Sequence, residues 1–331
     1  MPAPGTADRC ARPSRARWPL LTLLLPLFGS LASCAAGPEL RSLRAADAAD
    51  AAVELVAVPF FAQDAYQCGP AALATVLVHD GVQITPEQLT AQVYLPERQG
   101  SLQAELISAT RRNGRVPYRL PPTLMPILEE LRGGRPVLVL QNLGFGRWPV
   151  WHYAVLVGYD AQAETFLLRS GDERRRKTSA RAFLASWDRG GRWALVVAPP
   201  TAAPASANAQ SWLQAVAPFE STGELETAAA GYREAVRRWP QDADAWTALG
   251  NVRYRQSQLA DAETAYRRAL DLSTAQWTAR NNLVLTLVAR GCADAAREWI
   301  EQAGVPPDTM TSAWSRTLER WAAARDTQCS G

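Results

Sequence analysis

Cys68 is the first residue of this chain whose type and surroundings could support nucleophilic catalysis. It is followed by Gly-Pro and by an apolar stretch with helical spacing, which predicts a helix over 69–79. The positive end of such a helix would stabilise a thiolate, the form in which a cysteine attacks a carbonyl carbon. A buried structural cysteine at a helix start has the same local pattern, so Cys68 by itself leaves both interpretations open.

A catalytic cysteine needs a nearby imidazole, and the chain contains only two histidines. His79 lies eleven residues after Cys68 on the same predicted helix. It is therefore about three turns away and cannot reach the thiol. His152 opens the apolar run 152–159, typical of a buried strand, which folding could bring to a distant helix. We expect His152 to be the base, although a core or edge histidine would look the same in isolation.

The elements that must position these residues form a mixed pattern between 53 and 198. The expected helices cover 69–79, a short stretch after Thr85, 101–113, 124–132 and 180–187, and the expected strands cover 53–61, 136–141, 152–159, 165–169 and 192–198. Helices come first and mostly adjacent strands follow, which favours an α+β domain. The basic run 174–177 is typical of a solvated loop, and no basic tract indicates a nucleic-acid partner.

Beyond residue 209 the pattern becomes wholly helical, with a period of 34 residues. Trp212 recurs as Trp246 and Tyr232 recurs as Tyr266, while small alanines share two further registers. This pattern resembles the tetratricopeptide repeat, whose helix pairs offer a concave face to a protein partner. The third repeat departs from the pattern because Arg280 stands at the tryptophan position.

The N-terminal segment has the pattern of a secretory signal. Four arginines and one aspartate in the first 33 residues account for the formal charge of +3, so the rest of the chain is near neutral. The apolar core 20–31 is too short to span a bilayer. It ends at Leu-Ala-Ser-Cys34, which resembles a bacterial lipobox and implies acylation of Cys34. Ala35 follows Cys34 in place of the aspartate that retains such lipoproteins in the inner membrane, which favours the outer membrane facing the periplasm. An ordinary signal peptide with a chance cysteine is the alternative.

Two further cysteines, Cys292 and Cys329, remain in the C-terminal part. The periplasm permits a disulfide between them, and two unlinked thiols are the alternative. No cysteine or histidine spacing indicates zinc, and no motif implies a metal or an organic cofactor.

Taken together, the site motifs resemble the bacteriocin-processing peptidases, which are papain-like double-glycine leader peptidases. The resemblance rests on Gln63, on Cys68-Gly-Pro-Ala-Ala-Leu, and on His152-Tyr-Ala-Val-Leu-Val-Gly-Tyr about 80 residues later, and it covers about residues 55–198. It implies a papain-like fold, Cys68 as nucleophile, His152 as base and Gln63 as a donor to the oxyanion. Gln67 is the weaker alternative for this role. Gln63 lies five residues before Cys68, one residue closer than the corresponding glutamine in exporter-linked relatives.

The third catalytic residue is less clearly indicated. The family places an aspartate at the end of the strand after the histidine, to orient the imidazole. Here that region reads Ser170-Gly-Asp172, and we prefer Asp172 for its carboxylate, with Ser170 as the alternative closer to the motif position. Asp160 stands at the far end of the histidine's own strand and is too distant.

The sequence thus predicts an α+β papain-like cysteine peptidase domain followed by an all-α tetratricopeptide-repeat domain. The expected segments are a signal peptide (1–33), a tether (34–52), the peptidase domain (53–198), a Pro/Ala linker (199–209), the repeats (210–310) and a C-terminal helix and tail (311–331). The expected function is that of a lipid-anchored, periplasm-facing cysteine peptidase, acting on a peptide or protein and recruiting a protein partner through the repeats. One alternative is a catalytically weak adaptor that keeps the peptidase fold for binding. The other is a thiol acyltransferase or amidase that uses the same acyl-enzyme chemistry.

Overall fold

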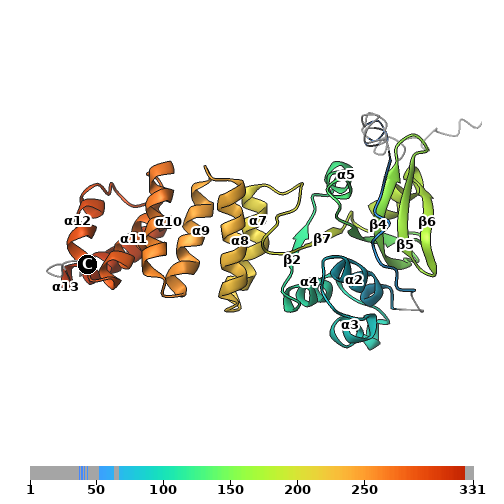
Figure 1. Ribbon diagram of the computed structural model, residues 1–331, viewed down its shortest axis with the longest axis horizontal. Helices are drawn as coiled ribbons and strands as arrows, with labels where there is room; N and C mark the ends of the chain where they lie inside the picture. The colour runs from blue at the N-terminus through green and yellow to red at the C-terminus, as the bar shows by residue number, and fades with distance from the viewer. Residues whose placement is uncertain are drawn as a thin grey trace, which may run out of the picture.

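The structure is a computed structural model that describes residues 52–62 and 67–324, together with residues 37, 39, 41 and 43. The described chain is elongated, with a sheet and its helices at one end and a row of paired helices at the other (Figure 1). The α+β domain and the all-α domain predicted from the sequence are both present.

A seven-stranded antiparallel sheet forms the centre of the first domain. Its strand order is β2-β7-β3-β4-β5-β6, and β1 pairs with the far end of β4. The strands are β1 (Ala52–Glu54), β2 (Val116–Arg119), β3 (Val137–Asn142), β4 (Trp151–Asp160), β5 (Thr165–Ser170), β6 (Glu173–Ser179) and β7 (Ala194–Ala198). Pairing between β4 and β5 starts at Val155, so the first residues of β4 extend beyond the end of β5.

Helices cover both faces of this sheet. They are α2 (Cys68–His79), α3 (Pro86–Val93), α4 (Gln103–Arg112), α5 (Leu124–Arg132) and α6 (Ala180–Arg189), with a 3₁₀ turn at Pro96–Arg98. Successive residues of β4 point to opposite faces, as a strand requires. Tyr153 and Val155 pack in the cluster around α2 and α4, whereas Ala154 and Leu156 pack in the cluster around α5 and α6.

The observed strands differ from the predicted ones at three places. The strand expected over 53–61 is only Ala52–Glu54, because a turn follows and Pro59 has no amide hydrogen to donate. The basic run 174–177, predicted as a loop, lies within β6. The reason is that β6 is an exposed edge strand and therefore carries no apolar alternation that could have revealed it. The third difference is strand β2, which was not predicted at all.

The second domain consists of α7 (Ala209–Ser221), α8 (Leu225–Arg238), α9 (Ala243–Arg255), α10 (Leu259–Leu272), α11 (Trp277–Ala289), α12 (Ala293–Glu301) and α13 (Asp308–Ala324). Close approach of paired helices depends on small residues: a Cβ on Gly250 would lie 2.5 Å from the Tyr266 ring. Arg280, at the predicted tryptophan position, is buried and donates to the Trp299 carbonyl oxygen at 3.1 Å. The departure from the repeat pattern is therefore accommodated by a buried guanidinium that bonds to the main chain.

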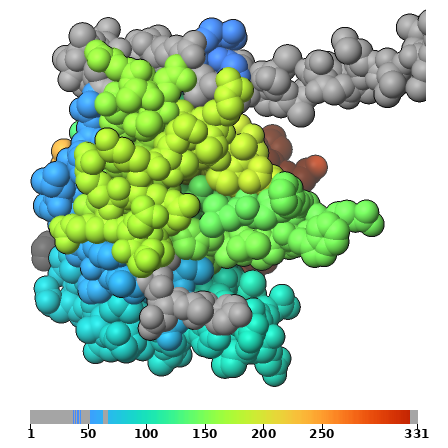
Figure 2. All heavy atoms as spheres, turned by 90° about the vertical axis from the view of Figure 1, so that its right-hand side faces the viewer, coloured from blue at the N-terminus to red at the C-terminus, as the bar shows by residue number. Residues whose placement is uncertain are grey.

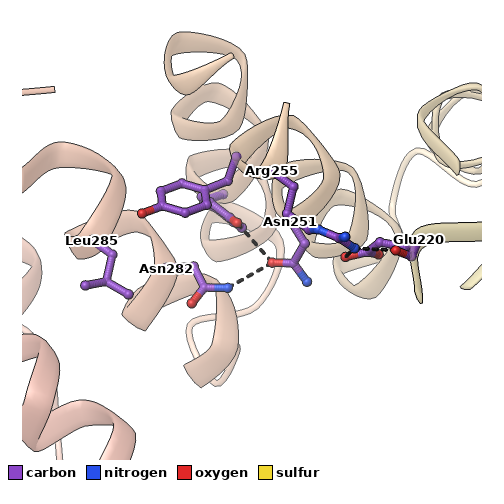
Figure 3. A pocket seen from close by; sticks show the side chains of 7 residues that line it. Glu220, Asn251, Arg255, Asn282 and Leu285 are labelled. Carbon is purple, nitrogen blue, oxygen red and sulfur yellow. Dashed lines mark hydrogen bonds and ion pairs between the residues drawn. The ribbon is translucent and has the colours of Figure 1, made fainter. Parts of the chain in front are cut away.

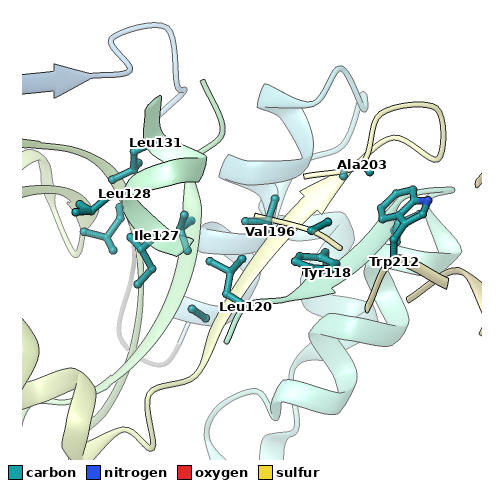
Figure 4. Close-up of a cluster of buried hydrophobic side chains, with 14 of the residues drawn as sticks. Tyr118, Leu120, Ile127, Leu128, Leu131, Val196, Ala203 and Trp212 are labelled. Carbon is teal, nitrogen blue, oxygen red and sulfur yellow. The ribbon is translucent and has the colours of Figure 1, made fainter. Parts of the chain in front are cut away.

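A continuous apolar core connects the sheet to the first repeat helices. Tyr118 of β2, Val196 of β7, Ala203 and Trp212 of α7 are all buried in the same cluster (Figure 4). The Tyr118 hydroxyl also lies 2.8 Å from Ser211 Oγ. The first repeat helix therefore packs directly against the edge of the sheet.

The Pro/Ala segment 199–209 is fixed between the two domains by polar contacts. Glu130 Oε1 accepts hydrogen bonds from the amide and the hydroxyl of Ser206, each at 2.7 Å. The Arg238 guanidinium donates to the carbonyl oxygens of 203–205. The segment is thus an ordered joint whose backbone is held from both sides. Within the described ranges, none of the helices has the length and apolar character needed to cross a membrane.

Candidate active site

Cys68 is the first residue of α2, the most buried helix of the sheet domain. Every residue from Gly69 to Leu77 is buried, whereas Cys68 itself is half-buried. Gly69 is required by close packing, because a Cβ there would lie 2.5 Å from Ser101 Oγ and 2.6 Å from Ser101 Cβ. A larger residue would push the start of α2 away from Ser101 and displace the thiol.

The Cys68 sulfur lies against the beginning of β4. Burial raises the pKa of the Cys68 thiol, while hydrogen bonds from the backbone amides of Tyr153, Gly69 and Cys68 itself oppose that shift. The Tyr153 amide belongs to the part of β4 that extends beyond the end of β5. Backbone amides from the start of α2 and from the start of β4 therefore both point to the Cys68 sulfur. The amide from β4 belongs to Tyr153, the residue that follows His152 in the sequence.

His152 is held by a hydroxyl group. Its Nε2 atom lies 2.8 Å from Ser170 Oγ, at the end of β5. With Nε2 occupied in this way, Nδ1 is the ring nitrogen left to exchange a proton with a thiol. Burial, assisted by the positive charge of Arg176, lowers the pKa of His152 to about 4. The resting imidazole is therefore neutral, and so is the thiol.

The carboxylate that we expected at this position from Asp172 is replaced by the Ser170 hydroxyl. Asp172 lies exposed in the turn between β5 and β6, whereas Ser170 is buried and bonded to the ring. The reason is the register, since Ser170 ends β5 and pairs with Glu173 across the turn that contains Asp172. Asp160 accepts the amide hydrogen of Ala163 in the β4–β5 turn and takes no part in the site.

The second histidine is excluded by position, as expected. His79 ends α2, and its Nε2 atom lies 3.0 Å from the Gly134 carbonyl oxygen. Sequence reasoning missed two contributors to the site, the Tyr153 amide and Arg176. A backbone amide has no sequence signal, and the strand β6 that positions Arg176 has no apolar pattern.

Three predicted residues lie outside the part of the chain that the structure describes: Gln63, Cys34 and Cys329. Gln67, the alternative oxyanion donor, is described; it is an exposed residue that immediately precedes α2. Cys292 is disulfide-bonded. Its pairing with Cys329 stays a prediction.

The hairpin between β3 and β4 projects beside His152 and exposes apolar side chains. Phe145, Trp148 and Trp151 are 77%, 74% and 56% exposed. The hairpin is nevertheless ordered, because Asn142 Oδ1 accepts the amide hydrogens of Gly144 and Val150. Figure 2 shows it as a green lobe that stands out from the surface. These aromatic residues do not cover the core edge and are available to a polypeptide.

A separate cavity of about 260 Å³ lies among the repeat helices. Asn251 of α9 is its polar centre, since its Oδ1 atom accepts from the Tyr266 hydroxyl and from Asn282 Nδ2, both at 2.9 Å (Figure 3). Arg255 lies 3.5 Å from Glu220 on the adjacent wall. The described residues that line this cavity include no cysteine and no histidine.

Comparison with known proteins agrees with the two-domain organisation. Residues 55–195 match the Peptidase_C39 like family, and residues 219–276 and 247–308 match the tetratricopeptide repeat. No curated protein matches this chain.

Several solved structures are similar to the first domain. A C39-like peptidase from Bacillus anthracis is 18% identical, with a TM-score of 0.36 and coverage of 44% of this chain and 96% of that chain. The peptidase domain of Streptococcus ComA, a bi-functional ABC transporter of a quorum sensing pathway, is 19% identical (TM-score 0.35; 43% and 98% covered). A double glycine motif protease from an AMS/PCAT transporter, solved with its leader peptide, is 24% identical (TM-score 0.33; 43% and 91% covered). This chain therefore carries a C39-peptidase-like domain followed by tetratricopeptide repeats.

Proposed function

We propose that this protein is a lipid-anchored cysteine peptidase that faces the periplasm, with Cys68 as nucleophile and His152 as base. The observation that carries the proposal is the meeting of α2 and β4 at the Cys68 sulfur, one residue from an imidazole whose Nε2 is already bonded to Ser170. Thiol catalysis requires a nucleophile and a base that a third group orients, and a helix start favours the thiolate.

The protonation of the resting pair favours general-base catalysis over a preformed ion pair. Both groups are neutral at pH 7, because burial raises the pKa of Cys68 and lowers that of His152. As the sulfur bonds to the substrate carbonyl carbon, the thiol proton passes to His152 Nδ1. The backbone amide of Cys68 and the Gln63 side chain would donate to the oxyanion. When the C–N bond breaks, the imidazolium returns its proton to the leaving amine. Water then hydrolyses the thioester.

The exposed hairpin supports a polypeptide substrate. Trp151 precedes His152 in β4, and Phe145 and Trp148 lie in the hairpin that leads into this strand. All three are exposed, so an extended chain entering the site could pack against them. The repeat domain would recruit the substrate or a protein partner through its inner face. The anchor would be an acylated Cys34, which calls for no transmembrane helix.

A second function, that of a catalytically weak binding module, is favoured by one observation. The imidazole is oriented by a neutral hydroxyl, and a hydroxyl stabilises a developing imidazolium less than a carboxylate does. Acyl transfer or amide hydrolysis by the same thioester is the third possibility, since the first half of each reaction is identical.

Thiol labelling separates a peptidase from a binding module. We expect a peptidyl electrophile to label the full-length protein at Cys68 and to leave Cys68→Ala unlabelled. His152→Ala should label about 10²–10⁴-fold more slowly at pH 7, the usual contribution of a general base. His79→Ala is the matched control and should label at the normal rate, because His79 lies at the other end of α2. Equal labelling of the His152 and His79 variants would leave the binding module as the better proposal.

The reaction and the anchor each need a separate measurement. Cell-envelope proteomics with the wild type and Cys68→Ala should reveal new peptide termini that depend on the thiol. Products in which an acyl group has moved to another amine would indicate transfer instead of hydrolysis. For the anchor, Cys34→Ala should release the protein from the membrane fraction and remove the mass of the acyl chains. Retention of the variant in the membrane would contradict the lipobox interpretation without affecting the proposal for Cys68.

A further inference from the structure

A cavity of about 200 Å³ lies on the α6 side of the sheet, directly beyond the hydroxyl that holds His152. Buried residues form its floor and exposed residues form its mouth. The floor includes Ser170 and Ser186, and the mouth includes Leu143, Arg176 and Arg189. The cavity is therefore open to solvent on one side and reaches the candidate site on the other.

The lining carries positive charge and no carboxylate. Arg176 of β6 and Arg189 of α6 both border the cavity, and no aspartate or glutamate among the described residues does. The acid nearest to Arg176 is Glu173, whose Oε1 atom lies 3.8 Å away; both side chains are about half exposed, at 45% and 56%. An exposed pair of this kind is weak, so it leaves the guanidinium able to bind another anion. Arg189 donates a hydrogen bond from its Nε to the Asn142 carbonyl oxygen at 3.2 Å, and none of the described residues accepts from its Nη atoms.

Ser170 connects this cavity to the imidazole. Ser170 lines the cavity, and its Oγ atom lies 2.8 Å from His152 Nε2. When neutral His152 carries its hydrogen on Nε2, that hydrogen is donated to Ser170 Oγ. The hydroxyl hydrogen of Ser170 then needs an acceptor of its own.

We propose that this cavity binds a carboxylate group, held by Arg176 and Arg189, that accepts the Ser170 hydroxyl hydrogen and completes the chain from His152. The proposal rests on the Cys68/His152 function given above and names a ligand class for the same site. A carboxylate fits the available volume, the two guanidiniums and the hydroxyl donor. Guanidiniums bind carboxylates through paired charge-assisted hydrogen bonds.

The bound carboxylate would act on His152 through charge and through the hydroxyl. The charged group that acts on the ring is Arg176 of β6. Glu173 lies beside Arg176, and Arg189 of α6 borders the same cavity. A negative charge in the cavity offsets Arg176, which contributes to the lowered pKa of His152. It therefore raises that pKa and favours the imidazolium that forms when Cys68 attacks. No bond to the carboxylate forms or breaks in this step.

The presence of only two histidines makes the effect directly measurable. In the purified full-length protein carrying labelled histidine, acetate should raise the titration midpoint of the His152 ring by about half a unit to one unit, relative to chloride at equal ionic strength. His79 is the internal reference and should not respond. The measurement can be made in Cys68→Ala, so it does not depend on activity. A failed proposal for the cavity is then distinguishable from a failed proposal for the thiol.

Variants at the mouth of the cavity test the assignment. The response of His152 to acetate should disappear in the Arg176→Gln/Arg189→Gln double variant and persist in Arg176→Lys, which keeps the charge. Thermal unfolding would verify that each variant is folded. If the double variant does not fold, Arg189→Gln alone replaces it and should reduce the response of His152 to acetate. No response to acetate in the wild type, or an equal response in the double variant, would overturn the proposal.

The carboxylate could come from solution or from the substrate, and electrophilic peptides distinguish these sources. We compare two probes that differ only in carrying Glu or Gln. If the substrate supplies the carboxylate, the Glu probe should label Cys68 about tenfold faster or more, because charge-assisted pairing is worth about 1.5–3 kcal/mol. That preference should be lost in the double arginine variant. A response to acetate without any preference for Glu would assign the cavity to a free carboxylate. Absence of both effects would overturn the assignment.

Discussion

The two members of the candidate pair are held in different ways. Cys68 begins a helix that is buried along almost its whole length, and backbone amides from α2 and β4 converge on its sulfur. His152 is held at Nε2 by one hydroxyl, beyond which lies a cavity with exposed arginines. The nucleophile is thus fixed by main chain and packing, whereas the base depends on side chains that single substitutions can change.

Acidification should destabilise the folded protein through His152, and this is the largest expected effect. The pKa of His152 is about 4 in the folded protein and 6.5 in a model peptide. The unfolded chain therefore binds the proton more readily between these values, and folding stability falls as the pH drops from 6.5 towards 4. The loss from this group should reach up to about 3 kcal/mol. Chemical denaturation across this range would measure it, with His152→Gln as the comparison. Parallel curves for the two proteins would contradict the lowered pKa.

A methyl group on Gly69 should disrupt the packing that positions Cys68. A Cβ there would overlap Ser101, so Gly69→Ala should destabilise the fold by about 1–3 kcal/mol and slow the labelling of Cys68. The same methyl should cost much less in a Ser101→Gly background, where the overlapping side chain is absent. A double-mutant cycle in denaturant measures this coupling. If the penalty is unchanged by Ser101→Gly, the cause is not the contact with Ser101.

Removal of the orienting hydroxyl should have a smaller effect on rate. Ser170→Ala deletes one neutral hydrogen bond to His152, which is worth about 0.5–1.5 kcal/mol. Labelling of Cys68 should therefore slow by about two- to tenfold. Asp172→Asn is the matched control and should leave the rate unchanged, since Asp172 lies exposed in the turn. A larger loss in Asp172→Asn than in Ser170→Ala would restore the aspartate as the third residue.

The smallest expected change concerns Arg176. Replacing its partly exposed guanidinium with the amide of Arg176→Gln removes a positive charge that lowers the pKa of His152. Without added carboxylate, that pKa should rise by about half a unit or less, and less still at high salt. Histidine resonances followed against pH would show the shift. A fall in the pKa would mean that Arg176 acts on the ring through something other than its charge.

The same contrast explains how much could be predicted from the sequence. Helix α2 and strand β4 carry long apolar patterns because both are buried, and each was predicted within one residue of its observed start. Ser170 as the partner of His152 depends on the register between β5 and β6, and β6 is an edge strand with exposed charged side chains. Its sequence therefore resembles a loop. The repeats were predictable because each contacts mainly its sequence neighbours, so their period is visible along the chain.

The ordered joint at 199–209 has a consequence for substrate selection. Glu130 and Arg238 hold its backbone, so the start of the repeat domain is held at a defined position beside the sheet domain. If the repeats bind the substrate of the proposed peptidase, the segment that reaches Cys68 would be the one that lies a corresponding distance along the polypeptide. The joint would then act as a molecular ruler, and the position of the cut would be set by length as well as by side-chain recognition.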